Sequence, residues 1–407
     1  MSDSSSVSLE EIRAARARVA PYIRKTPLLP FDYLSRRGKH EVLLKCEVLQ
    51  RTGSFKIRGA ANCILENLAQ AKKAGVIATS AGNHAQGVAA LCHLLGIRST
   101  IVMPTLTPAI KVQNTQGWGA TVELVGNIYN ESFDHAMHLA EKNGYLFVHP
   151  YRDPLVIAGQ GTIGLELDED PVFGAAEAVI VPVGGGGLVT GIASALRALR
   201  PGIKIYGVTA KNAPGTYQSF RSGKAGMAEA KFTLAEGVAT KGTDDTMLAH
   251  LKFAVDEMLA MSEESIAHAI AVLAEHGKLV VEGAGALSVA ALLEDQIPEK
   301  RVVAVLSGGN LDLPALSNVL HRGLVEQGRL VRLVVTIVDR PGALLKITQA
   351  LAERGANVLQ VFHRRTTLRA ALDEAEVELD LDTRGEKHTL EIIEGLTERG
   401  FQVHRVA

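Results

Sequence analysis

The feature that most constrains the fold is a repeated alternation of short apolar strands and helices over the first 310 residues. Strands that are apolar along most of their length are predicted at 41–46, 75–79, 99–103, 121–125, 145–149, 178–183, 204–209 and 302–306. Helices are predicted between many of them, for instance at 56–73, 132–143, 154–169 and 188–199. Such strands are typical of parallel sheets whose two faces are both covered by helices. The sequence therefore predicts an α/β fold of parallel type.

After residue 330 the pattern changes to strand, helix, strand, strand, helix, strand. These elements are predicted at 331–338, 343–354, 357–362, 374–381, 386–399 and 401–406. The order βαββαβ is the ferredoxin-like layout. We therefore predict a first domain at 1–325, a linker at 326–330 and a second domain at 331–407.

Composition excludes several classes of function. The 407 residues carry a formal net charge of −1, so there is no basic surface field for nucleic acid. Cys46, Cys63 and Cys92 form no CxxC pair, which argues against a disulfide framework and a zinc site. The serine-rich start lacks the pattern of a secretory signal, and no apolar run reaches the roughly 18 residues that span a bilayer. We expect a cytoplasmic protein.

Four consecutive glycines, Gly184 to Gly187, stand between a predicted strand and a predicted helix. Glycines let backbone N–H groups turn toward an anion, and a helix N-terminus adds partial positive charge. Val189 in the sixth position breaks the GxGxxG spacing of dinucleotide sites, and the triphosphate motif GxxxxGK[ST] is absent. The run predicts a phosphate site, and a tight turn needed only for packing is the alternative.

Lys56 differs from the other lysines in its neighbours. Gly53 and Ser54 precede it, Phe55 places an apolar ring beside it, and Arg58 follows two positions later. A lysine amine attacks a carbonyl carbon only when its charged form is disfavoured by burial or by nearby cations. We therefore expect Lys56 to be a nucleophile, with a pKa lowered by apolar packing and by the charge of Arg58.

Four segments in order resemble one family, the threonine/serine dehydratases of the tryptophan-synthase-β fold group. They are Ser-Phe-Lys-Ile-Arg-Gly at 54–59, Ser-Ala-Gly-Asn-His-Ala-Gln-Gly at 80–87, the glycines at 184–187 and Ser-Gly-Gly-Asn at 307–310. The resemblance implies two parallel-type α/β subdomains, the smaller at about 50–150 inserted into the larger. It also implies the cofactor pyridoxal 5'-phosphate and a homodimer or homotetramer.

The resemblance also implies roles for individual residues. Lys56 would hold the cofactor as a Schiff base and, once freed by the substrate amine, would remove the Cα proton. The other implied cofactor-binding residues are Phe55, Asn83, Gly184, Gly185, Gly186, Gly187, Leu188 and Ser307. The implied substrate carboxylate site is lined by Ser80, Ala81, Gly82, Asn83 and His84.

Ser307 is implied to face the pyridine nitrogen of the cofactor. A carboxylate in this place keeps the nitrogen protonated and makes the ring a strong electron sink. A neutral hydroxyl does not enforce that protonation. Loss of a β-hydroxyl, which takes up the electrons, is then favoured over transamination.

The segment Asp-Arg-Pro-Gly at 339–342 resembles the first turn of ACT domains, which bind amino acids as regulatory ligands. Asp339, Pro341 and Gly342 are the implied regulatory residues, and isoleucine or valine is the implied effector. The sign of the effect is left open.

The implied function is β-elimination of L-threonine, and of L-serine, to 2-oxobutanoate or pyruvate and ammonia, in isoleucine biosynthesis or in threonine degradation. One alternative is an amino-acid racemase, but the family's racemases use a serine in the position of Ala81. Another is a non-catalytic amino-acid sensor, against which the intact motifs argue.

No metal site is predicted. His135 and His138 have helical spacing without a third ligand, so a solvated helix face is the simpler interpretation. Some relatives place a cation near an acidic residue, but that position is Thr209 here. The segment 282–285 matches a family segment near the active site and equally fits a turn that starts a helix.

Overall fold

The computed structural model describes residues 7–365, 371 and 373–406. These residues fall into two compact units, Met1–Leu311 and Asp312–Ala407. The division precedes helix α14 (Leu313–Glu326), which was not predicted from the sequence. The predicted boundaries at residues 325 and 330 stay predictions.

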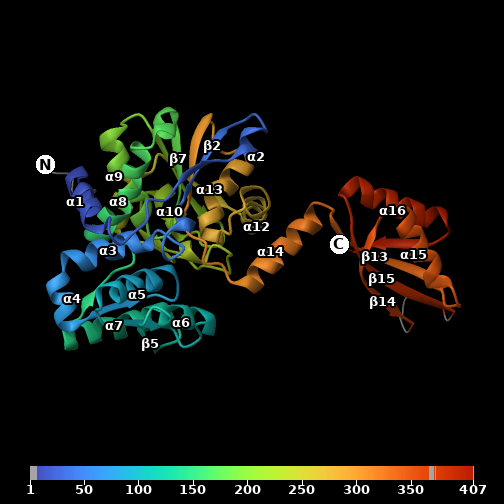
Figure 1. Ribbon diagram of the computed structural model, residues 1–407, viewed down its shortest axis with the longest axis horizontal. Coiled ribbons are helices and arrows are strands. Elements are labelled where there is room, and N and C mark those ends of the chain that lie inside the picture. The colour runs from blue at the N-terminus through green and yellow to red at the C-terminus, as the bar shows by residue number, and fades with distance from the viewer. Residues whose placement is uncertain (1–6, 366–370, 372, 407) are drawn as a thin grey trace. The chain divides into compact units, whose positions relative to one another are not determined.

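The first unit contains most of the secondary structure (Figure 1). Its α-helices are α1 (Leu9–Val19), α2 (Asp32–Ser35), α3 (Lys56–Glu66), α4 (Leu68–Ala74), α5 (Asn83–Leu95), α6 (Ala109–Gln116), α7 (Tyr129–Asn143), α8 (Pro154–Asp168), α9 (Gly187–Leu199), α10 (Gly215–Ser222), α11 (Asp245–Ala254), α12 (Glu263–Val272) and α13 (Gly283–Leu293). Its strands are β1 (Leu28–Pro30), β2 (Glu41–Cys46), β3 (Val76–Thr79), β4 (Ser99–Met103), β5 (Thr121–Leu124), β6 (Leu146–Phe147), β7 (Ala178–Pro182), β8 (Lys204–Ala210), β9 (Gly226–Met227), β10 (Gly242–Thr243), β11 (Glu257–Met261) and β12 (Arg301–Leu306). Single turns of other helix types are η1 (Glu47–Leu49), η2 (Pro171–Ala175), η3 (Glu236–Val238) and η4 (Leu273–Gly277).

The large sheet of the first unit has the strand order β1-β2-β12-β7-β8-β11. All of its pairs are parallel except β1 with β2. Figure 1 shows α8 and α9 on one side of β7 and α13 on the other. The apolar side of α8 and α9 packs against β7 and β12 through residues such as Ile163, Val189 and Val303. The predicted α/β fold with a parallel sheet covered on both faces is confirmed.

A smaller sheet has the order β5-β4-β3-β6, and all of its pairs are parallel. Its strands lie between residues 76 and 147, inside the region where the resemblance implies an inserted subdomain. Helices α5, α6 and α7 lie beside this sheet at the bottom of Figure 1. Its core joins residues of α3, α5 and the strands, among them Ile64, Val88 and Ile101.

Local sequence signals explain two helix boundaries. A capping box starts α1, because Ser8 Oγ accepts the N–H of Glu11 while the Glu11 carboxylate accepts the N–H of Ser8. The helix predicted at 56–73 is instead two helices, α3 and α4. They are separated by Asn67, whose side-chain amide donates to the Cys63 carbonyl at 2.9 Å and so competes with the backbone ladder.

Strand β11 was not predicted. Its residues, Glu-Met-Leu-Ala-Met, favour a helix by intrinsic propensity. Parallel pairing with β8 overrides that preference. Residues 211–243, for which no regular element was predicted, contain α10, β9, η3 and β10.

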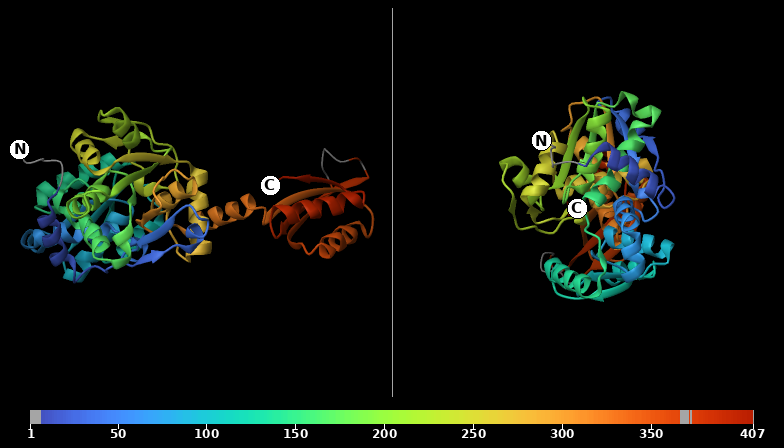
Figure 2. Two further views of the ribbon diagram at one scale, coloured as in Figure 1. Left: turned by 90° about the horizontal axis from the view of Figure 1, so that it is seen from above. Right: turned by 90° about the vertical axis from the view of Figure 1, so that its left-hand side faces the viewer.

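The second unit consists of α14, β13 (Leu330–Val338), α15 (Ala343–Glu353), β14 (Asn357–Arg364), β15 (Glu374–Asp382), α16 (Glu386–Glu398) and β16 (Gln402–Arg405). Its antiparallel sheet has the order β14-β15-β13-β16, as the ferredoxin-like layout requires. Figure 2 shows α15 and α16 on one face of this sheet. Alternate residues of β13, such as Leu333 and Val335, pack against Ile347 and Ile392 of these helices. The predicted βαββαβ fold is confirmed.

Within the part of the chain that the structure describes, none of the helices has the length and apolar character needed to cross a bilayer.

Candidate active site

The predicted site segments follow the carboxyl ends of parallel strands. Ser307 comes directly after β12, and Gly184 comes two residues after β7, the neighbour of β12 in the large sheet. Ser80 comes directly after β3 of the small sheet. Ligands of open α/β sheets bind at this edge. The topology therefore supports the predicted grouping of these three segments.

Lys56 is the first residue of α3 and is half-buried. Its Nζ donates a hydrogen bond to the carbonyl oxygen of Pro150 at 2.9 Å and lies 5.2 Å from the centroid of the Phe55 ring. Burial lowers the pKa of Lys56 to about 8, while the carboxylate of Glu282 acts in the opposite direction. The expectation of a lysine with a lowered pKa is confirmed.

The expected contribution of Arg58 to that pKa was wrong. The Arg58 guanidinium is fully buried and paired with two carboxylates, Glu47 and Glu166, at 2.8 Å and 2.6 Å. The two carboxylates therefore neutralise the positive charge of Arg58, which exerts little net field on Lys56. Burial, rather than a neighbouring cation, lowers the pKa of Lys56.

The backbone joins the lysine segment to the serine segment. The N–H of Phe55 donates to the Ser307 carbonyl at 3.1 Å, and the N–H of Gly309 donates to the Gly53 carbonyl at 2.8 Å. Ser307 is 4% exposed. The two predicted ends of the cofactor site, Lys56 and Ser307, are thus held next to each other.

The glycine run forms the turn between β7 and α9. Gly186 has φ +91°, a conformation that residues with a Cβ rarely adopt, and it is the N-cap of α9 without any side-chain cap. A Cβ on Gly187 would lie 2.5 Å from the Tyr151 carbonyl oxygen. A Cβ on Gly185 would lie 2.5 Å from the Tyr151 ring. Packing thus requires glycine here, and the α9 N–H groups remain available to an anion.

Tyr151 and Pro150 were missed by the sequence analysis. Pro150 accepts the hydrogen bond of Lys56, and Tyr151 packs on Gly185 and Gly187. This short segment therefore links the lysine amine to the glycine turn. The available signal was its position just after the predicted strand 145–149.

Leu188 and Phe55 contribute apolar side chains to the core of the large sheet. Leu188 is 6% exposed, so any contact that it makes with a phosphate at the turn would use its backbone N–H. Phe55 is 9% exposed and keeps one side of its ring near the Lys56 amine.

The segment Ser80 to His84 forms the start of α5. Ser80 Oγ accepts the N–H of Gly82 at 3.2 Å, and no side chain caps the helix, which leaves the N–H groups of its first turn open to an anion. Ala81 and Gly82 are half-buried, and a Cβ on Gly82 would meet no atom within 4 Å. This arrangement is suited to a carboxylate.

His84 is buried and neutral, because burial lowers its pKa to about 3. Its Nε2 lies 2.9 Å from the Val148 carbonyl oxygen, so Nε2 carries the proton and donates. Nδ1 is then an acceptor, and it is buried without a partner in the described part of the chain. His84 in this tautomer has no free N–H for a carboxylate.

Asn83 is held between two side chains that the sequence analysis did not assign. Its Nδ2 donates to Glu282 Oε1 at 2.6 Å, and its Oδ1 accepts from Asn310 Nδ2 at 2.7 Å. Burial raises the pKa of Glu282 to about 7, and the hydrogen bond from Asn83 opposes that rise. The segment 282–285 thus starts α13 and also contributes Glu282 to the site.

The predicted absence of a metal site stays a prediction. Among the described residues there is no group of three or more His, Cys, Asp or Glu side chains suited to a metal ion. His135 pairs with Glu123 at 3.1 Å on the surface, and Thr209 is buried with no partner for its hydroxyl in the described structure.

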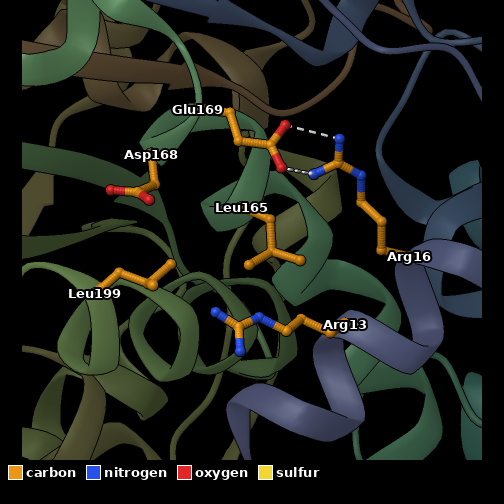
Figure 3. Close-up of a pocket in the computed structure, with 6 residues that line it drawn as sticks. All are labelled: Arg13, Arg16, Leu165, Asp168, Glu169 and Leu199. Atoms are coloured by element: carbon orange, nitrogen blue, oxygen red, sulfur yellow. Dashed lines mark hydrogen bonds and ion pairs between the residues drawn. The ribbon is translucent and has the colours of Figure 1, made fainter.

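A surface pocket of about 350 Å³ lies elsewhere in the first unit, between α1, α8 and α9 (Figure 3). Arg16 and Glu169 form a two-point ion pair at its rim, with distances of 2.6 Å and 2.7 Å. None of the predicted site residues lines this pocket, so it is separate from the Lys56 region.

The predicted regulatory residues lie at one turn of the second unit. Gly342 has φ +86° and is the N-cap of α15, and Pro341 is exposed. The Asp339 carboxylate lies 3.2 Å from Arg365 and 3.9 Å from His363. The turn is thus open to solvent and carries charges of both signs.

The residues of the first site fit pyridoxal phosphate. Lys56 has an amine with a lowered pKa that could take the aldehyde, and the N–H groups of the α9 turn could donate to the phosphate. Ser307 has a buried hydroxyl, which the ring nitrogen would need as a neutral partner. Ser54 Oγ and His84 Nδ1 are buried polar atoms without partners in the described structure, as expected beside a polar ligand.

Comparisons with known proteins agree with this fit. The sequence model of the family described as pyridoxal-phosphate dependent enzyme matches residues 19–308, and that of the ACT domain matches 331–398. The L-threonine ammonia-lyase of Thermotoga maritima is 45% identical over 401 residues, which cover 98% of this chain and 100% of that protein.

Two solved structures are similar to most of this chain. A threonine deaminase from T.th. has a TM-score of 0.70 at 41% identity and covers 75% of this chain and 99% of that one. Maize serine racemase has a TM-score of 0.73 at 32% identity and covers 79% of this chain and 99% of that one.

Proposed function

The chain belongs to the family of pyridoxal-phosphate dependent enzymes, and we propose that it acts as an L-threonine ammonia-lyase controlled by its ACT domain. The observation that carries the proposal is agreement over almost the whole chain with an L-threonine ammonia-lyase, joined to a lysine amine of lowered pKa at the cofactor site. The enzyme converts L-threonine to 2-oxobutanoate and ammonia. We expect L-serine to give pyruvate in the same way.

Pyridoxal phosphate, when bound, withdraws electrons from the Cα of the substrate amine. We propose that Lys56 would hold the cofactor covalently through its amine, which the substrate amine would replace. The freed Lys56 amine would serve as the base that accepts the Cα proton of the substrate. This exchange brings the base to the reacting atom, which is a large advantage over a free base in solution.

The proposed cofactor contacts follow the geometry. The N–H groups of Gly184 to Leu188 would hold the phosphate at the N-terminus of α9, which has no side-chain cap. Phe55 lies beside the Lys56 amine, and Asn83 is aimed by Glu282 and Asn310. Ser307 would face the ring nitrogen as a neutral group, which would favour loss of the β-hydroxyl over transamination.

The proposed substrate carboxylate site is the start of α5, from Ser80 to His84. Support comes from its uncapped first turn and from the open space above Gly82. His84 shapes this site and offers an acceptor at Nδ1, since its N–H is used by Val148.

The test is formation of 2-oxobutanoate from L-threonine by the purified enzyme and by its Lys56→Ala variant. We expect rapid product from the wild type and none above background from the variant. Substantial threonine-dependent keto acid from the variant would overturn the role of Lys56.

Racemisation is the second candidate, and similarity to maize serine racemase is the observation in its favour. A racemase needs an acid on the face of Cα opposite the lysine. Position 81 holds alanine, which has no proton to give. Formation of D-serine from L-serine at a rate that matches elimination would favour the racemase.

We further propose regulation of the enzyme by isoleucine or valine bound near Asp339, Pro341 and Gly342 of the ACT domain. A coupling free energy of about 1–3 kcal/mol is typical of such control. Equal kinetics with and without each amino acid would contradict it. A homodimer or homotetramer, a cytoplasmic location and a role in isoleucine biosynthesis or threonine degradation are likewise proposed from the family.

A further inference from the structure

Four charged side chains are buried together beneath the start of α3. Their exposed side-chain fractions are 2% for Lys45, 0% for Glu47, 0% for Arg58 and 3% for Glu166. We call these four residues the buried quartet. None of them is used by the proposed reaction, and their formal charges sum to zero.

Arg58 is the centre of the quartet. Its Nε and Nη2 each donate to the Glu47 carboxylate at 2.8 Å. Its Nη1 and Nη2 donate to the Glu166 carboxylate at 2.6 Å and 3.0 Å. Lys45 Nζ donates to the same Glu166 carboxylate at 2.6 Å. Two fork-shaped contacts thus fix both the position and the plane of the guanidinium.

A quartet of this kind is weak evidence for stability. Removing charges from water carries a large free-energy penalty, and well-packed apolar residues often replace buried ion pairs without loss of stability. A neutral quartet also exerts little net field on Lys56, whose pKa is lowered by burial. The effect of the quartet on Lys56 is therefore one of position.

The quartet connects the two proposed ends of the cofactor site. Glu47 comes directly after Cys46, the last residue of β2, and Cys46 pairs with Leu306 in β12. Ser307 is the next residue. The pair of Arg58 and Glu47 therefore fixes α3, which begins at Lys56, relative to the strand end that carries Ser307.

Helices α8 and α5 pack closely against α3 and restrict its distance from them. We infer that the quartet restricts the rotation of α3 about its own axis. A Cβ on Gly159 of α8 would lie 2.5 Å from the Arg58 carbonyl oxygen, so α8 and α3 are in backbone contact. A Cβ on Gly87 of α5 would lie 3.0 Å from the Ile57 nitrogen.

No side chain caps the start of α3. The backbone hydrogen bonds of Phe55 and Gly309 hold the segment just before α3 against the Ser307 segment. The Arg58 forks add side-chain contacts from the first turn of α3 that restrict its rotation.

We propose that Arg58 is a positioning residue, which acts through the buried quartet to hold the Lys56 amine in register with Ser307. Arg58 does not touch the reacting atoms. The inference rests on the proposed role of Lys56 as the lysine that binds the cofactor.

The test uses Arg58→Lys, which keeps the charge of the quartet and loses the fork. The matched control is Arg16→Lys, which makes the same change in the two-point pair with Glu169, the residue that follows α8 (Figure 3). Each apoprotein is mixed with pyridoxal phosphate. The covalent bond at Lys56 is trapped with borohydride over time and quantified by mass spectrometry. Steady-state kinetics with L-threonine and thermal unfolding of the apoprotein complete the set.

We expect Arg58→Lys to slow covalent attachment at least tenfold and to lower kcat at least tenfold. KM for threonine should change less than threefold, because the start of α5 is untouched. Arg16→Lys should match the wild type in the rate of attachment, in kcat and in KM. Wild-type attachment and kcat in folded Arg58→Lys would overturn the inference. Absence of attachment in the wild type would instead overturn the proposed function.

A second variant covers the case in which Arg58→Lys does not fold. Arg58→Met combined with Glu47→Gln removes one charge of each sign and leaves the pair of Lys45 and Glu166. Slow attachment in this folded variant supports the inference, and wild-type attachment overturns it. Failure of both variants to fold also overturns it, because the quartet would then serve folding.

Discussion

The reactivity of Lys56 in the apoprotein should depend on pH in a way that the structure predicts. The pKa of Lys56 is lowered to about 8 from the ordinary 10.5. An amine reacts with carbonyl and acylating reagents only in its neutral form. At pH 7 the difference of 2.5 between the two pKa values makes the neutral fraction of Lys56 roughly 300-fold larger than that of an ordinary lysine.

The assay is competitive labelling. Apoprotein and a blocked lysine derivative are treated together with a trace of acetylating reagent from pH 6 to pH 11, and modified Lys56 is quantified by peptide mass spectrometry. We expect the Lys56 rate to reach half its maximum near pH 8 and that of the blocked lysine near pH 10.5. Coincidence of the two profiles would refute the argument, because burial would then not disfavour the charged amine.

A change at Glu282 should move the Lys56 profile in a defined direction. The pKa of Glu282 is about 7, so this side chain is mostly ionised where Lys56 titrates, and its charge raises the pKa of Lys56. Glu282→Gln removes the charge and keeps an oxygen that can accept from Asn83. The half-maximum should move to lower pH. A shift to higher pH would contradict the assigned sign.

Two glycine substitutions test the proposed ligand sites by backbone strain, which costs about 1–2 kcal/mol for a left-handed residue with a Cβ. Gly186→Ala (φ +91°) should weaken pyridoxal phosphate binding about fivefold to thirtyfold in a spectroscopic titration. The control Gly223→Ala (φ +71°) should bind the cofactor like the wild type. Equal cofactor affinities of Gly186→Ala and the wild type would contradict the phosphate site.

Gly342→Ala (φ +86°) should weaken isoleucine or valine binding measured by calorimetry, with Gly355→Ala (φ +70°) as the control in the same unit. Unchanged binding in Gly342→Ala would contradict the proposed effector site.

The sequence predicted those parts of the fold that depend on local pattern. Apolar strands such as 178–183 and 302–306 predicted a parallel sheet, because few other elements bury both faces. Strand β11 was missed, because its residues favour a helix and only pairing with β8 makes it a strand. Helix α14 was also missed, in a stretch where no regular element was assigned.

The site was predictable where chemistry follows residue type. Lys56 and the glycines at 184–187 were found in this way. Pro150 and Tyr151 were not, because their role comes from backbone contacts across the fold rather than from their side-chain chemistry. Glu282 could not be assigned to the site from the sequence, because carboxylates are common at helix starts for reasons unrelated to ligands. Its hydrogen bond from Asn83, which the structure shows, places it in the site.

The ion pairs of Arg58 separate its effect on the position of Lys56 from any effect on the Lys56 pKa. A cation two residues after a lysine suggests an electrostatic effect, but the structure balances that cation with Glu47 and Glu166. Because the quartet is neutral, it can fix the rotation of α3 without changing the charge state of Lys56. Burial of the amine sets the pKa separately. Reactivity and position of the lysine thus depend on different residues, so a variant of Arg58 should alter the rate of attachment while leaving the pH profile of Lys56 labelling near that of the wild type.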